Sequence, residues 1–424
     1  MKKILTVLMI LAIAGSLFVG CSRSTESGGP VTLTMWNQDS NTTDITIPAF
    51  ERSHPHIRIE RVPISWDEFP LKIQQSLMAG LEMPDFLFAE ITYRGQMFAM
   101  DIWENLEQPP YNATKDLFFE SSVGLMQNAR GEIIAIDHSP SPTGLAYKKG
   151  PARQWLGTDD RTALENMFQS LDDFVRIGAE VSRASGGNVF MFSSPQNFLT
   201  WMRKVSPLGI VDSDGAINFT GIMRDGIDLL IRMRNANAVD VFEAWSPQDN
   251  TSFAGDNHIF YLLPNWGPAF MFKPFDPDGQ GRWGVMIPPT GAFSWGGTAQ
   301  GIYKDSKHKA EAWEYLYWFS FSEEGTALLK RENDYYTPVK RFYDDASFAS
   351  NFDPYFGIDT GSYFFLELMP TIVPPTFSIY DGFFEQTSHA VANFVMADRS
   401  VTTQQALAMG IEELQSRVDD RQVK

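Results

Sequence analysis

The sequence predicts an α/β protein built as two domains. Strand and helix patterns alternate over residues 31–90, which is typical of a parallel sheet with helices on its faces. About 400 residues follow residue 20, and this is more than one hydrophobic core usually supports. A Pro- and Gly-rich stretch, residues 273–297, interrupts the later helical regions. These observations together predict two α/β domains.

The first predicted element is a strand, because apolar residues alternate with threonines from Val31 to Met35. A helix follows, for which Thr42 or Thr43 is the candidate N-cap, and His54-Pro55 ends it. Apolar residues alternate again at 57–62, which predicts the second strand.

The next helix carries Phe69, Ile73 and Leu77 on one face and is closed by Gly80. An apolar run at 86–88 then predicts the third strand. The order strand, helix, strand, helix, strand favours parallel pairing, because each helix returns the chain to the same edge of the sheet.

The later part of the chain is largely helical. Ser170 is positioned to cap a helix that stops at Gly186. Residues 283–287 form a strand-like run inside the Pro- and Gly-rich stretch. Thr402 and Gln405 have the spacing of a capping box and predict the start of a terminal helix.

The composition excludes several classes of function. The net charge is -18, and it becomes -20 if residues 1–20 are removed with Lys2 and Lys3. Such a negative chain without basic clusters is not expected to bind nucleic acid. The six histidines have no H-E-x-x-H spacing, and neither a nucleophile elbow nor a phosphate loop occurs. We therefore expect no metal and no cofactor.

The N-terminus carries an export signal. Lys2 and Lys3 precede an apolar run at 4–18 that is too short to span a bilayer, and Cys21 is the only cysteine. This arrangement resembles a bacterial lipoprotein signal, although Phe18 stands where such signals usually have Leu. The resemblance implies cleavage of the signal peptide, residues 1–20, acylation of Cys21, a flexible tether over 21–30 and an extracytoplasmic, lipid-anchored location. The alternative is a plain signal peptide with an incidental cysteine.

Candidate binding residues follow two of the predicted strands. Trp36 and Asn37 lie beyond the first strand, and Glu90 and Tyr93 lie beyond the third, where open α/β sheets place their ligands. A flat ring beside a carboxylate or an amide suits a sugar, which offers a C–H face and hydroxyl groups. The alternatives are core packing for Trp36 and a solvated loop position for Glu90.

Two further tryptophans lie in rigid turns. Trp266 is enclosed by Pro264 and Pro268, and Trp295 precedes Gly296-Gly297, where the backbone can approach a ligand closely. Both rings could instead pack the turns in which they lie. Weaker candidates, each favoured as structural when taken alone, are Trp66, Thr143, Tyr336 and Asp381.

Ordered stretches of the chain resemble family 1 extracellular solute-binding proteins, the sugar-type receptors of ABC importers. His56, where Gly is common, and residues 81–83 depart from that pattern in loops. The stretches that carry the resemblance are 31–36, 47–55, 77–80 and 83–86, then 142–147, and finally 296–302, 306–313 and 322–325.

The resemblance implies a two-lobe fold of the periplasmic-binding-protein type (type II), with ligand held in a hinged cleft. Lobe 1 would comprise residues 31–145 and 286–338, and lobe 2 residues 146–285 and 339–424. The chain would cross near 139–147, return near 284–289 and cross again near 336–339. Closure over a ligand requires contacts from both lobes.

The implied function is that of a monomeric receptor, not an enzyme, which captures a sugar or oligosaccharide and delivers it to a cognate ABC permease. The same fold could instead carry a polyol, a peptide or a phosphate ester. A surface glycoside hydrolase is the rival from another class. It would need two carboxylates placed across a glycosidic bond, and the sequence offers no means of choosing such a pair.

Overall fold

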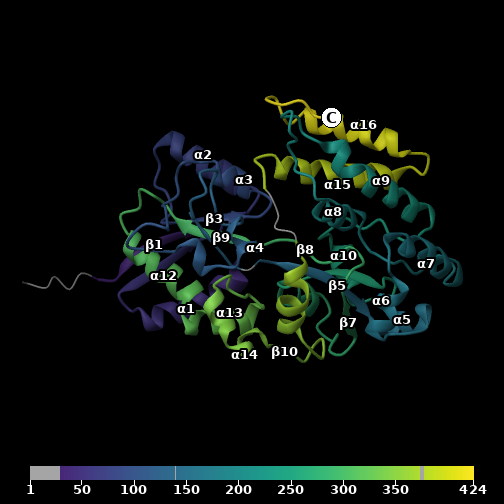
Figure 1. Ribbon diagram of the computed structural model, residues 1–424, viewed down its shortest axis with the longest axis horizontal. Coiled ribbons are helices and arrows are strands. Elements are labelled where there is room, and N and C mark those ends of the chain that lie inside the picture. Colours follow the sequence, from purple (N-terminus) through teal and green to yellow (C-terminus); the bar gives the residue numbers. More distant parts are fainter. Residues whose placement is uncertain (1–28, 139, 373–376) are drawn as a thin grey trace, which may run out of the picture.

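The computed structural model describes residues 29–138, 140–372 and 377–424. The predicted signal peptide, Cys21 and nearly all of the tether lie outside these residues. In the described part, no helix combines the length and apolar character needed to cross a bilayer. The described chain folds around two hydrophobic cores, each built on its own sheet (Figure 1).

The first lobe is built on a mixed five-stranded sheet in the order β2-β1-β3-β9-β4. Strand β1 pairs parallel with both β2 and β3, as the alternating strand and helix pattern predicts. Strand β9 returns from far along the chain and pairs antiparallel with β3 and β4. The strands are β1 (Val31–Trp36), β2 (Ile57–Val62), β3 (Phe86–Glu90), β4 (Ile136–Asp137) and β9 (Thr298–Ile302).

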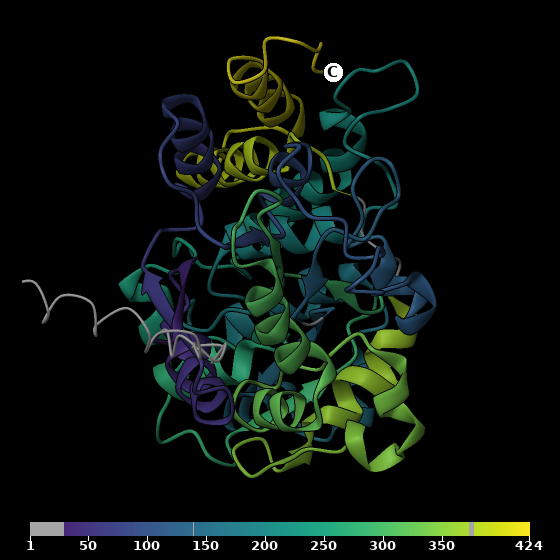
Figure 2. The same ribbon diagram turned by 90° about the vertical axis from the view of Figure 1, so that its left-hand side faces the viewer.

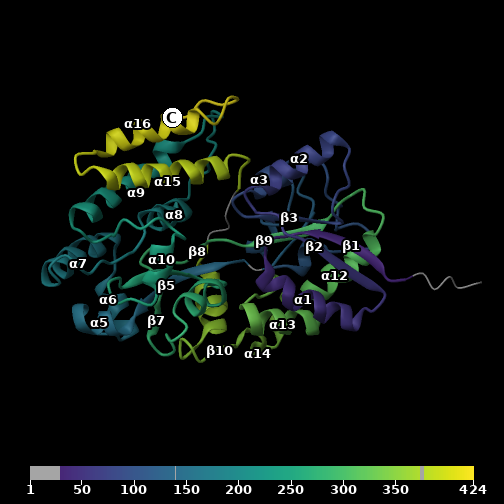
Figure 3. The ribbon, with the colours of Figure 1, turned by 180° about the vertical axis from the view of Figure 1, so that it is seen from behind.

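Helices cover both faces of this sheet. Helices α1 (Ser40–Ser53), α12 (Lys309–Phe321) and α13 (Glu323–Asn333) lie on one side. Helices α2 (Phe69–Ala79) and α3 (Arg94–Phe98) lie on the other, as Figure 3 shows from behind. Between α3 and β4 run the short η1 (Lys115–Leu117) and α4 (Glu120–Val123).

The N-cap of α1 differs from the prediction. The side chain of Asp39 accepts the N–H of Thr42, so the helix begins three residues before the threonines that we expected to cap it. The two threonines turn inward instead and are buried. A threonine-rich pattern marks a helix start only to within a turn, because any of several polar side chains can take the capping position.

The second lobe is built on a smaller sheet whose central strand is β5 (Pro142–Lys148). All its pairings are antiparallel. The other strands are β6 (Phe260–Pro264), β7 (Trp283–Met286) and β8 (Phe293–Ser294). Beside the lobes lies the hairpin of β10 (Phe352–Asp353) and β11 (Ile358–Asp359).

Helices dominate the second lobe. Four of them, α8, α9, α15 and α16, pack against one another and form the upper part of the lobe in Figures 1 and 2. Apart from α12 and α13 of the first lobe, the described helices after β5 are α5 (Lys149–Leu156), α6 (Arg161–Met167), α7 (Leu171–Ala184), α8 (Pro195–Val205), α9 (Phe219–Asn235), α10 (Pro247–Ser252), η2 (Pro268–Phe272), α11 (Lys273–Phe275), η3 (Lys340–Asp344), α14 (Ala346–Ala349), η4 (Ser362–Leu368), η5 (Met369–Thr371), α15 (Asp381–Ala397) and α16 (Thr403–Gln415).

Two helix starts confirm the capping patterns read from the sequence. Ser170 forms a capping box with Asp173 at the start of α7, and Thr402 forms one with Gln405 at the start of α16. In each case the N-cap hydroxyl and the acidic or amide side chain three residues later satisfy reciprocal backbone groups.

Three segments connect the two sheets, and each contains a residue with positive φ. Ser141 (φ 51°) lies between β4 and β5, Gly296 and Gly297 (φ 86° and 98°) lie between β8 and β9, and Asp334 (φ 52°) follows α13. Along the third passage the chain contacts the two cores in turn, because Tyr335 packs against the first core, Tyr336 belongs to the second and Val339 belongs to the first.

The expected lobe boundaries after residue 145 and before residue 286 fall inside β5 and β7. Both strands pair wholly within the second sheet. The chain therefore crosses between Asp137 and Pro142 and returns between Ser294 and Thr298. A strand pattern alone does not show which sheet a strand joins, since partners are chosen by packing.

Candidate functional site

A cavity of about 730 Å³ lies between the two lobes and receives side chains from both. Its first wall comes from the loops at the carboxyl ends of β1, β2 and β3. Its second wall comes from the turn after β6, the segment before α10, and helices α8 and α15. The connecting segments form its base. The main lining residues are Gln38, Asp39, Trp66, Glu90, His138, Asn197, Thr200, Trp245, Trp266, Phe270, Trp295, Gly296, Tyr335, Glu385 and His389.

On the first wall, Trp66 is held by both its backbone and its ring. Its N–H donates to the side-chain oxygen of Gln38 at 3.1 Å. Its ring packs at a tilt against Phe69 and Phe88, with centroids 6.3 and 6.2 Å away. The remaining face of the indole lines the cavity, where it is available for stacking.

Glu90 ends β3 and places a half-buried carboxyl on the same wall. Burial raises the pKa of this carboxyl to about 7, with a further contribution from the negative charge of Glu385 across the cavity. The N–H of Thr92, which donates to the carboxyl at 2.8 Å, opposes the shift. The ionised and the neutral forms of the Glu90 carboxyl are therefore present in similar amounts at neutral pH.

The second wall is aromatic. The ring of Trp266 lies 6.0 Å from that of Trp245 in a stacked arrangement, 5.4 Å from Trp295 and 6.3 Å from Phe270. Its Nε1–H donates to the carbonyl of Trp295 at 2.9 Å, which fixes the plane of the indole. Trp245 remains 47% exposed. These rings form one continuous surface for stacking.

Polar groups of the second wall come from α8 and α15. Glu385 forms an ion pair with Arg203 at 2.9 Å, and Arg203 also contacts Asp381 at 3.0 Å. Burial acts to raise the pKa of Glu385, but the positive charges of Arg203, Lys204 and His389 together outweigh it and hold that pKa below its usual value. His389 lies 3.4 Å from the hydroxyl of Thr200, and burial lowers the pKa of its imidazole.

The base of the cavity joins the two lobes. Tyr335 of the third connection stacks on Phe270 of the second lobe, with centroids 6.3 Å apart and planes within 13°. Beneath the second connection lies Arg94, which is fully buried and donates to the carbonyl of Gly297 at 3.0 Å while pairing with Asp137. The cavity base is therefore anchored to the first lobe by a buried ion pair.

Among the described residues, no group of three or more histidine, cysteine, aspartate or glutamate side chains is arranged to hold a metal ion. No lysine or arginine lines the cavity in that part of the chain. The lining combines flat rings with carboxylate, amide and imidazole groups, which suits a neutral ligand rich in hydroxyl groups.

A family model of bacterial extracellular solute-binding proteins matches residues 46–353. The chain belongs to this family of solute-binding proteins. It is a receptor and not an enzyme, because the family consists of binding proteins. A comparison with curated protein sequences finds no significant match.

Solved structures of other solute-binding proteins share the fold. A family 1 extracellular solute-binding protein is 19% identical, with 91% of this chain and 99% of that chain covered and a TM-score of 0.77. The lacto-N-biose complex of the galacto-N-biose/lacto-N-biose I-binding protein from Bifidobacterium longum is 17% identical, with coverage of 94% and 100% and a TM-score of 0.73. The sugar-binding protein MalE from Xanthomonas citri is 17% identical, with coverage of 91% and 98% and a TM-score of 0.71.

These similarities establish that this solute-binding protein has the two-lobe fold of type II periplasmic binding proteins, as its sequence predicts. Four of the residues selected from the sequence line its interlobe cavity, namely Trp66, Glu90, Trp266 and Trp295. Trp66 lines the cavity, although a structural role was the favoured interpretation for this residue taken alone.

Three selected residues near the first wall do not line the cavity. The ring of Trp36 is buried against α2, with the Lys72 ammonium 5.6 Å from its centroid. The side chain of Asn37 turns back and accepts the N–H of Asp39. Tyr93 lies against Gly382 of α15. Trp36 and Tyr93 thus pack against helices distant in the sequence, whereas Asn37 forms a local turn with the backbone.

The other three have buried structural contacts in this solute-binding protein. Thr143 lies inside β5 and donates to the carbonyl of Ser141. Tyr336 packs in the second core, 4.0 Å from the ring of Phe365. Asp381 begins α15 and forms the ion pair with Arg203.

Sequence reasoning missed several lining residues. Trp245 adopts φ 65°, a left-handed backbone that no pattern in the segment before α10 announces. Asp39 was not selected, because the predicted N-cap of this helix was Thr42 or Thr43. It lies only three residues after the end of β1. Glu385 and His389 lie four residues apart on α15, a spacing that places them on one helical face and could have been noticed.

Proposed function

We propose that this solute-binding protein is the lipid-anchored receptor of an ABC importer and carries a sugar or small oligosaccharide to a membrane permease. The observation that carries the proposal is the aromatic wall of the interlobe cavity, where Trp245, Trp266 and Trp295 face the carboxyl of Glu90. Receptors of the same fold bind lacto-N-biose and maltose, according to their solved complexes, and this supports a saccharide as cargo.

In the proposed complex, the C–H face of a sugar ring lies on Trp266, and its hydroxyl groups donate to Glu90 and Glu385. The two carboxyls belong to opposite lobes. A ligand that bonds both is held more tightly in the closed form, and this differential affinity is what drives closure. The three connections with their positive-φ residues are the proposed hinge.

Export and anchoring are part of the proposal. Acylation of Cys21 would leave the receptor on the outer side of a membrane, with residues 21–30 as the tether to the first strand. We propose that the receptor acts as a monomer, with its lobes facing the permease.

Isothermal titration with mono-, di- and oligosaccharides tests the cargo, with polyols, peptides and phosphate esters as controls. One sugar class is expected to bind, and Trp266→Ala is expected to weaken it about tenfold because a stacking surface is lost. Trp155→Ala, at a half-buried tryptophan of α5 outside the cavity, is the matched control and should bind normally. If a control solute bound and no sugar bound, the saccharide assignment would be refuted.

A further inference from the structure

A second cavity of about 640 Å³ lies in the second lobe, outside the interlobe site. Three segments line it: residues 187–190 after α7, residues 240–242 after α9, and the stretch from α10 to β6. The rings of Phe190 and Phe242 are half-buried in its wall. No lysine or arginine lines this cavity among the described residues.

His258 is the central polar group of this outer cavity. It is only 3% exposed, and its ring lies between Phe190, stacked at 5.6 Å, and Phe242 at 5.4 Å. Its Nε2 lies 2.9 Å from a carboxylate oxygen of Asp240. The other oxygen of Asp240 accepts the N–H of Val241 at 2.8 Å, so both oxygens of this carboxylate are in use.

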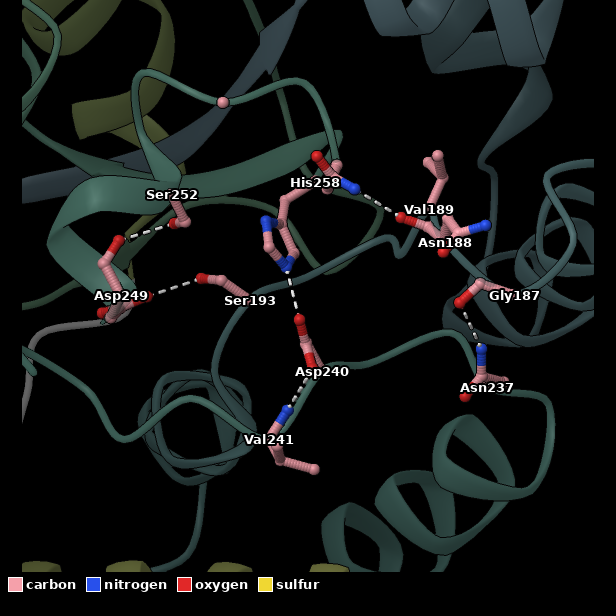
Figure 4. A network of polar contacts seen from close by, with 12 residues as sticks. Gly187, Asn188, Val189, Ser193, Asn237, Asp240, Val241, Asp249, Ser252 and His258 are labelled. Atoms are coloured by element: carbon pink, nitrogen blue, oxygen red, sulfur yellow. Dashed lines mark hydrogen bonds and ion pairs between the residues drawn. The ribbon is translucent and has the colours of Figure 1, made fainter. Parts of the chain in front are cut away.

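The second imidazole nitrogen has no hydrogen-bond partner. Because Nε2 faces a carboxylate, Nε2 carries the proton of the neutral ring and Nδ1 is left as a bare acceptor. Within the described residues nothing donates to Nδ1. Figure 4 shows it turned away from Asp240 toward the side where Ser252, another lining residue, is located. A buried acceptor without a donor is costly, which points to a ligand group that supplies the donor.

The remaining lining groups restrict the chemistry of that ligand. An anion would find no cation in the lining, and a cation would find only the carboxylate of Asp240, which is already bonded to His258 and Val241. Amide side chains of Asn188 and Gln248 stand at the exposed rim. Apolar rings, rim amides and one buried acceptor fit a neutral ring that carries hydroxyl groups.

We propose that the outer cavity is a second binding site, which takes a single neutral saccharide ring whose hydroxyl donates to Nδ1 of His258. The ring's C–H face lies on Phe190 or Phe242. This site is separate from the interlobe cargo site, and it requires no closure of the lobes because one lobe supplies all its contacts.

The two cavities share one segment. Phe242 lines the outer cavity and Trp245 lines the interlobe cavity three residues later. The N–H of Trp245 donates to the buried carboxylate of Asp249 at 3.1 Å, and Ser193 donates to the other oxygen of that carboxylate at 2.7 Å. Figure 4 shows Ser193 and Asp249 in the same region as His258, as a separate group of polar contacts. Occupation of the outer site is therefore positioned to affect a cargo-binding ring.

The experiment labels the six histidines of the full chain with ¹⁵N and follows their ring nitrogens during titration with glucose, galactose and maltose. His258→Gln assigns the His258 signals. We expect a saturable upfield shift of its Nδ1 signal with at least one of these sugars and none with inorganic phosphate. His138 and His389 line the interlobe cavity, so the same spectra report the cargo site separately.

Two variants assign the response to its site. Thr251→Arg, at an exposed lining position of α10, fills the outer cavity and should abolish the His258 shift while His138 and His389 respond normally. Thr162→Arg, at an exposed position of α6, is the matched control and should change nothing. The shift should persist in Trp266→Ala.

Three results would overturn the proposal. The first is the absence of a saturable His258 shift with every sugar tested. If the cargo-site histidines responded in that experiment, the proposed function would still hold. The second is a shift that survives Thr251→Arg, which would place the ligand elsewhere. The third is a shift that disappears in Trp266→Ala, which would show that it is transmitted from the interlobe cavity.

Discussion

Glu90 gives this solute-binding protein a pH-dependent stability that one substitution should remove. Burial and the charge of Glu385 raise its pKa in the folded chain from 4.5 to about 7. The folded state therefore binds this proton more tightly than the unfolded state. The stabilisation is complete below pH 4.5 and is lost as the pH rises through 7. At about 1.36 kcal/mol per pH unit, the loss is up to about 3 kcal/mol.

Glu90→Gln keeps the shape of the side chain and its acceptor for the N–H of Thr92, but it cannot ionise. The variant should therefore match the wild type near pH 5 and exceed its free energy of unfolding by up to about 3 kcal/mol at pH 8. Urea denaturation of both proteins without ligand, at intervals from pH 5 to pH 8, measures the difference. Titrating groups that do not interact with Glu90 cancel in the comparison.

The matched control is Glu60→Gln, which changes an exposed carboxylate of β2 by the same chemistry. It measures the effect of removing a surface carboxylate over the same pH range. If the difference between Glu90→Gln and the wild type did not grow between pH 5 and pH 8, the reasoning from burial and from the opposing carboxyl would fail.

Three further predictions follow from contacts described above. Arg94→Met should lower the free energy of unfolding by about 3–5 kcal/mol in urea denaturation, because it removes the positively charged partner of a buried carboxylate; a loss under 1 kcal/mol would contradict the anchoring role. Gly296→Ala should weaken cargo binding in calorimetry, since its Cβ would lie 2.4 Å from Nε1 of Trp266, whereas Gly281→Ala, with similar positive φ but open space, should bind normally; equal affinities would exclude the clash. Cys21→Ser should move the exported protein from the membrane fraction to the soluble fraction, and unchanged fractionation would exclude a lipid anchor.

The sequence predicts the architecture well because local patterns determine it. Alternation in β1 and β2, the capping boxes of α7 and α16, and the order of strands and helices all act over a few residues. The partners of β5 and β7 are different, since both strands are buried along their whole length and either sheet could accept them. Sheet membership is decided by packing between distant segments, and this moved the lobe crossings away from the expected positions.

In the candidate site, too, local patterns could be predicted from the sequence and contacts between distant segments could not. The rule that ligands bind beyond the carboxyl ends of strands points to loops that border the interlobe cavity, and Glu90 follows it directly. The rule does not fix the direction of a side chain. Trp36 turns toward α2, while Asp39 and the backbone beyond it reach the cavity. Trp245 depends on a left-handed backbone held by Asp249, and no sequence pattern signals that contact.

The aromatic wall also makes the molecule its own optical probe. Four of the 11 tryptophans, Trp66, Trp245, Trp266 and Trp295, border the cavity from both lobes. Indole emission shifts to shorter wavelength when water leaves the ring, and Trp245 is the ring with the most water to lose. Cargo capture by the native chain can therefore be followed in real time by its intrinsic fluorescence, without a dye and without altering the surface that would meet a permease.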